Sequence, residues 1–81
     1  MPMHTPDPTD QQIAAVVVSA LDEAGIDWHV AADRAGIART TMRRRLEGHT
    51  SFTVPELIRV AALIETTPAE ILTRAGQVVA A

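Results

Sequence analysis

The chain has 81 residues, enough for one small domain, and it contains no cysteine, which excludes disulfide bonds, thiolate zinc sites and a cysteine nucleophile. No apolar run approaches the roughly 20 residues that span a bilayer, and residues 1–6 lack the basic flank and apolar centre of a signal peptide. The net charge of −3 hides a segregation, because residues 34–45 hold five arginines and no acidic residue, whereas the remainder holds two arginines and ten acidic residues. We therefore expect an intracellular protein with one basic segment in an otherwise acidic chain.

Residues 1–8 hold three prolines and little that can be buried, so we expect a disordered arm there. Thr9 and Gln12 then have the spacing of a capping box, which predicts the start of a first helix. Gly25 closes this helix. Its apolar residues recur at helical spacing: Ile13, Val16, Val17, Ala20, Leu21 and Ala24.

Asp27 is a suitable N-cap for a short second helix over residues 28–35. Gly36 ends that helix, because a residue without a Cβ atom adopts the left-handed conformation of a sharp turn. A third helix follows over residues 39–47 and ends at Gly48.

Two capping boxes, each with a proline in its first turn, begin a fourth and a fifth helix at residues 53–56 and 67–70. The fifth helix ends before Gly76, so the domain spans residues 9–76. Residues 77–81 form an apolar tail that either frays or packs against a second copy. The apolar face of the fourth helix comprises Leu57, Ile58, Val60, Ala61, Leu63 and Ile64.

Five short helices with short connections, and no alternation typical of strands, predict a compact all-α domain. The segment AADRAGIARTTMRRRLEGHTSFTVPELIRVAALIETTPAEIL, residues 31–72, resembles the phage-repressor and Cro-like helix-turn-helix family, also called the XRE family. It is most similar to variants from actinobacteria and their phages, and the resemblance covers about residues 10–75. It implies a lambda-repressor-like DNA-binding fold. The matching positions are Ala32, Gly36, Ile37, Met42, Leu46, Gly48 and residues 52–63.

The geometry of the third helix favours the same interpretation. At about 100° per residue, Met42 and Leu46 lie within about 40° of each other and define an inward stripe, from which Thr40, Arg43 and Arg44 point away. Nine residues form a helix about 13 Å long, which fits a major groove about 12 Å wide.

Base contacts are implied by the resemblance, since the family reads bases from the first turns of this helix. Arginine can donate two hydrogen bonds to guanine, and threonine can contact the methyl group of thymine. The alternative is a solvated helix face whose arginines pair with acidic residues. The residues at which base contacts are implied are Arg39, Thr40, Arg43 and Arg44.

For other residues in or next to this helix, we expect structural roles. Arg45 stands where the family often has Leu or Ile. We therefore expect its aliphatic stem to lie along the core edge and its guanidinium group to pair with a neighbouring carboxylate. Glu47 is either a helix-surface residue or an acceptor for a cytosine amine. Ala38 replaces the usual capping Ser or Thr, so the helix starts without that stabilisation, typically about 1 kcal/mol.

The resemblance also implies phosphate contacts at Trp28, His49, Thr50 and Ser51, whose polar groups are suitable donors. For Trp28 the alternative is burial against the first or fourth helix, the usual fate of a lone tryptophan. For the other three it is an ordinary polar loop.

The three histidines share no helix face, so no metal site is expected. The sequence has no Gly-rich phosphate loop, nucleophile elbow or acid/base pair, so we expect neither an enzyme, nor a cofactor, nor a small-molecule ligand.

These features together predict a sequence-specific regulator of transcription, of repressor or Cro-like type, in the bacterial cytoplasm and nucleoid. Its partner is a double-stranded DNA operator, on which we expect a homodimer, with no membrane partner. One alternative is a helix-turn-helix antitoxin or a phage excision factor. Another is a protein-interaction module that does not bind DNA.

Overall fold

The computed structural model describes the backbone of residues 8–80 and the side chains of residues 9–76. Within that range the secondary structure is entirely helical, which confirms the predicted all-α fold with five helices. None of these helices is both long and apolar enough to cross a membrane. The helices are α1 (Pro8–Ala24), α2 (Trp28–Ala35), α3 (Arg39–Leu46), α4 (Val54–Leu63) and α5 (Pro68–Ala80).

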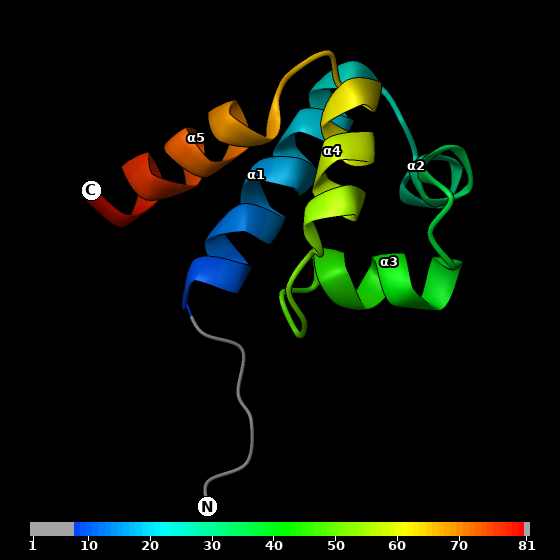
Figure 1. The fold of residues 1–81 in the computed structure, drawn as a ribbon, viewed down its shortest axis with the longest axis horizontal. Coiled ribbons are helices and arrows are strands. Elements are labelled where there is room, and N and C mark those ends of the chain that lie inside the picture. Colours follow the sequence, from blue (N-terminus) through cyan, green and yellow to red (C-terminus); the bar gives the residue numbers. More distant parts are fainter. Residues whose placement is uncertain (1–7, 81) are drawn as a thin grey trace, which may run out of the picture.

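α1 lies along α5 and also contacts α2 and α3 (Figure 1). α4 packs against α2 and α5. The backbone of α3 lies close to α1 and α2, its Arg45 side chain reaches Glu56 of α4, and Figure 1 shows α3 at the lower edge of the domain. One side of α3 is therefore left open to solvent.

The core is built from side chains of all five helices. The largest fully buried side chains come from α1, α3, α4 and α5, in the order Val17, Met42, Val60 and Ile71. α2 adds only small buried residues, Ala31, Ala32 and Ala35. Because alanine side chains are short, the backbone of α2 can lie close to its neighbours α3 and α4.

α2 and α3 form a helix-turn-helix whose turn is made by Gly36. This glycine has φ 67° and ψ 32°, the left-handed conformation that L side chains rarely adopt. The N–H groups of Gly36 and Ile37 donate to the carbonyls of Asp33 and Ala32, at 3.3 and 2.9 Å. This is the Schellman pattern, and the buried Ile37 side chain anchors it in the core.

The end of α3 is docked on α1 at a second left-handed glycine. The His49 N–H donates to the Arg44 carbonyl at 3.1 Å around Gly48, whose φ is 77°. A Cβ atom on Gly48 would lie 3.0 Å from Cγ of Gln11 on α1. The loop after α3 is tied to the same helix, since the Ser51 hydroxyl donates to the carboxylate of Asp10.

The helix starts agree with the sequence in most places. α4 begins with the predicted capping box, in which the Thr53 hydroxyl accepts from the Glu56 N–H and the Thr53 N–H donates to Glu56 Oε1. The Thr67 hydroxyl accepts from the Glu70 N–H at 3.1 Å at the start of α5. α2 begins after Asp27 as predicted, but the Asp27 side chain makes no capping hydrogen bond.

Three boundaries differ from the prediction. α1 begins at Pro8, so Thr9 lies in its first turn and does not cap it; a proline fits there because no N–H partner is required. The rest of the predicted arm lies outside the described residues. α3 ends at Leu46, with Glu47 as its C-cap. α5 continues through Gly76 to Ala80, and the side chains of the predicted tail lie outside the described ones.

Candidate nucleic-acid interface

The outer face of α3, formed by Thr40, Arg43 and Arg44, is exposed to solvent. The Arg43 side chain is 69% exposed. On the opposite side Met42 is fully buried and Leu46 is half-buried, which confirms the inward stripe. No described element covers the outer face.

Arg45 lies on the inner side of α3 and is held by two neighbours. Its Nε donates to Glu56 Oε1 at 2.9 Å, and its Nη1 donates to Thr50 Oγ1 at 2.6 Å. The side chains of Arg45 and Glu56 are only 18% and 13% exposed. The expected pairing of Arg45 with a carboxylate at the core edge is confirmed.

The same pair sets the protonation of Glu56. Burial alone would raise the pKa of Glu56, but hydrogen bonds from Arg45 and from the Thr53 N–H outweigh it. The pKa of Glu56 is therefore held below its ordinary value. Glu56 is a charged link between α3 and the start of α4.

Arg39, the first residue of α3, reaches back across the turn to Asp33 of α2. Its Nη2 lies 2.6 Å from Asp33 Oδ2 and its Nε lies 3.1 Å from Oδ1, a bidentate pair. Both side chains are more than half exposed. The hydrogen bond from Arg39 lowers the pKa of Asp33, and the same bond raises the pKa of Arg39. The guanidinium is thus fixed along one edge, while Nη1 points to no partner among the described residues.

The remaining arginines of the segment are less restrained. Arg43 Nε lies 3.4 Å from Glu47 Oε2, one turn further along α3, and His49 Nε2 lies 3.7 Å from the other oxygen of Glu47. Glu47 is therefore a surface residue that accepts locally. Arg44 and Arg34, both exposed, have no hydrogen-bond or ion-pair partner among the side chains of residues 9–76. Two guanidinium groups of the basic segment are therefore available to a partner outside the described part of the chain.

The loop after α3 contains the three polar residues expected to reach phosphate. The His49 side chain is 58% exposed. The Thr50 hydroxyl accepts from Arg45, and the Ser51 hydroxyl donates to Asp10. Thr50 and Ser51 thus form hydrogen bonds within the domain, and His49 lies beside Glu47.

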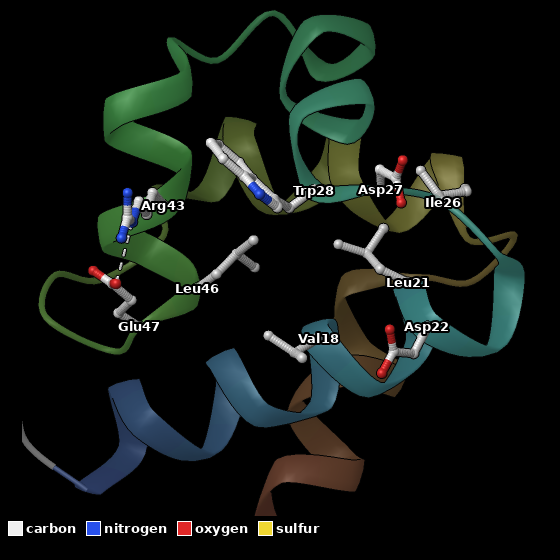
Figure 2. A pocket seen from close by; sticks show the side chains of 9 residues that line it. All are labelled: Val18, Leu21, Asp22, Ile26, Asp27, Trp28, Arg43, Leu46 and Glu47. Atoms are coloured by element: carbon white, nitrogen blue, oxygen red, sulfur yellow. Dashed lines mark hydrogen bonds and ion pairs between the residues drawn. The ribbon is translucent and has the colours of Figure 1, made fainter.

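Trp28 at the start of α2 is not buried against α1 or α4, which corrects the alternative interpretation from the sequence. Its side chain is 40% exposed and borders a hollow between α1, α2 and α3 (Figure 2). The α2 face that enters the core is made of alanines, so the indole at the first position of the helix remains at the rim. Its ring meets the ring of His29 edge to face, with centroids 5.6 Å apart.

The chain is similar in structure to the clp gene regulator ClgR from Corynebacterium glutamicum. The two align with a TM-score of 0.84 and 15% sequence identity, over 89% of this chain and 77% of the ClgR chain. At this identity the likeness shows the fold, an all-α helix-turn-helix domain. No family model and no curated protein matches the chain.

Two acidic residues that organise this surface carry no signal in the sequence. Asp33 stands six residues before Arg39 across a turn, so no helical spacing links the two. Asp10 is 41 residues from Ser51, and only the packing of the loop on α1 brings them together. The pairing of Arg43 with Glu47, by contrast, has the i, i+4 spacing that a sequence can reveal.

Proposed function

We propose that this protein is a sequence-specific double-stranded DNA-binding regulator of transcription whose α3 enters the major groove. The observation that carries the proposal is the outer face of α3, an exposed row of Thr40, Arg43 and Arg44 on a helix presented by the Gly36 turn. Eight residues make α3 about 12 Å long, which matches the width of the groove. The structural likeness to a gene regulator supports the same function.

Base contacts are proposed for four residues of α3: Arg39, Thr40, Arg43 and Arg44. Arg39 is oriented for such a contact, because its Nε and Nη2 both donate to the carboxylate of Asp33 and this fixes the plane of the guanidinium. The two Nη groups can still donate end-on to O6 and N7 of a guanine. Asp33 is then a positioning residue for base recognition.

Phosphate contacts are proposed for Trp28, His49, Thr50 and Ser51. Thr50 accepts from Arg45 and keeps its own hydroxyl hydrogen for a phosphate oxygen. Ser51 gives its hydrogen to Asp10, so its contact requires that bond to open. The indole N–H of the exposed Trp28 is a further donor.

The proposed regulator is of the phage-repressor or Cro type and acts as a homodimer on an operator, with half-sites about 34 Å apart. A symmetric dimer suits a module this small, because one recognition helix reads only a few base pairs. With about four phosphate contacts per subunit, we expect a log–log salt slope of about −7.2 for the dimer.

The test is retention, at about 100 mM salt, of duplexes that the wild-type protein has selected from a random DNA pool. The double variant Arg43→Ala/Arg44→Ala is compared with Arg59→Ala/Arg74→Ala, which removes the same charge from α4 and α5. We expect the first to weaken binding about thirtyfold or more, since two side chains that can each read a base are lost. We expect the second to bind as the wild type does. Equal retention by the two variants would contradict the groove model and leave a protein-interaction module.

A further inference from the structure

A hollow of about 590 Å³ opens between α1, the start of α2 and α3 (Figure 2). The apolar part of its lining comes from Val18 and Leu21 of α1, Trp28 of α2 and Leu46 of α3. Val18 and Trp28 are each 40% exposed, so two large apolar side chains face water in the same hollow. The volume of the hollow lies within the range of sites that bind small molecules.

The charged residues around the hollow are predominantly acidic. Asp22 and Asp27 lie on one side, and neither side chain has a hydrogen-bond or ion-pair partner among the described residues. Glu47 lies on the other side beside Arg43 (Figure 2). The hollow is therefore lined by three carboxylates and one guanidinium group. This excess of negative charge favours a cationic ligand and disfavours an anionic one.

We propose that this hollow binds a small amphipathic organic cation. The apolar body of the ligand lies against Trp28, Val18 and Leu46, and its ammonium group pairs with Asp22 and Asp27. The indole ring adds to this preference, because a cation is attracted to the face of an aromatic ring. The proposal departs from the expectation that the chain has no small-molecule ligand, since the hollow forms only when α1, α2 and α3 pack together.

The site shares Arg43 with the outer face of α3. A ligand body that packs on Leu46 lies beside Arg43 and Glu47, so we expect the ligand to change the affinity for DNA. By reciprocity, DNA changes the affinity for the ligand by the same factor. This coupling rests on the proposed function, whereas the ligand site itself does not.

The chain itself supplies the reporter for a test, because Trp28 is its single tryptophan and it has no tyrosine. The full chain without DNA is titrated with 2-phenylethylamine while the emission of Trp28 and the NMR signal of its indole N–H are followed. The neutral 2-phenylethanol and the anionic 3-phenylpropionate are matched probes. We expect both Trp28 signals to change and saturate with the amine. The concentration at the midpoint should be about tenfold or more higher for the alcohol, and the anion should give no saturation.

The carboxylates are tested in the variant Asp22→Asn/Asp27→Asn, with Glu23→Gln, an exposed acid outside the hollow, as the control. We expect the double variant to raise the amine midpoint about tenfold or more and the control to leave it unchanged. Each single variant is used if circular dichroism shows that the double variant loses helix. The proposal is overturned if neither signal saturates, if amine and alcohol titrate alike, or if the aspartate variants bind as the wild type does. None of these outcomes depends on whether the protein binds DNA.

Discussion

Arg44 and Arg45 are neighbours in the sequence, but α3 gives them different environments. Arg45 is only 18% exposed and is held by Glu56 and Thr50 at the core edge. Arg44 is exposed and has no partner among the described side chains. The difference comes from the turn of about 100° between successive helical residues. A cluster of arginines therefore does not have one role, because the helix face decides which residues stabilise the fold and which remain available.

The exposed pairs on α3 lie between these two cases. Arg39 and Arg43 each have an acidic partner, but all four side chains are exposed to solvent. Pairs of this kind contribute little to stability, so an arginine can exchange its carboxylate for a base or a phosphate at small cost. Exchange of the half-buried partners of Arg45 would leave Glu56 unpaired in a poorly solvated place.

The largest effect on stability is expected at Met42, on the inner face of α3. We expect Met42→Ala to lower the free energy of unfolding by about 2–5 kcal/mol, because a fully buried side chain is replaced by a cavity. Urea unfolding followed by circular dichroism measures the loss. Arg44→Ala, on the outer face, should stay within about 0.5 kcal/mol of the wild type. Similar losses in both variants would show that the two faces are not distinct.

The ion pair at the core edge is expected to have the next largest effect. Glu56→Gln should lower the free energy of unfolding at neutral pH by about 1–3 kcal/mol, since it removes the charge that Arg45 faces in a half-buried site. The exposed Glu23→Gln is the control.

The sign of the pH dependence follows from the lowered pKa of Glu56. The advantage of the wild type over Glu56→Gln should be complete above 4.5, the ordinary pKa of the group, and disappear as the pH falls through the lower folded value. A difference that persists unchanged at acidic pH would mean that the charge of Glu56 does not stabilise the fold.

The smallest effect is expected at Asp33. Asp33→Asn should leave the unfolding curve unchanged, because the pair with Arg39 is exposed. It should relax the preference for guanine at the position read by Arg39 by up to about tenfold, since the guanidinium is no longer fixed along one edge. Selection of duplexes by both proteins measures this preference. Identical base frequencies would exclude Asp33 as a positioning residue.

The sequence was sufficient to predict the helices because their starts and ends are local signals. Each of these signals involves residues that are close together in the sequence. They are the caps formed by Thr53 with Glu56 and by Thr67 with Glu70, and the turn at Gly36. The inward stripe of α3 also follows from periodicity alone. α4, in contrast, ends at Leu63, and the chain turns after it at Glu65, a residue other than glycine that has a left-handed φ of 56°.

Features that depend on tertiary packing could not be predicted. The bond from Ser51 to Asp10 joins a loop to the first turn of α1. The exposure of Trp28 depends on how α1 and α3 stand beside the start of α2. The sequence predicts an end of α5 before Gly76, but a glycine lowers helix propensity by only about 1 kcal/mol and does not stop a helix by itself.

Protection of guanine N7 from methylation tests most directly whether the outer face of α3 reads bases, because N7 lies in the major groove. Duplexes selected from a random pool are methylated with and without the bound protein. We predict protected guanines in each half-site, lost at one position with Arg44→Ala and retained with Arg59→Ala. Bound duplexes without protected guanines, or with the same protection in both variants, would contradict a major-groove role for α3.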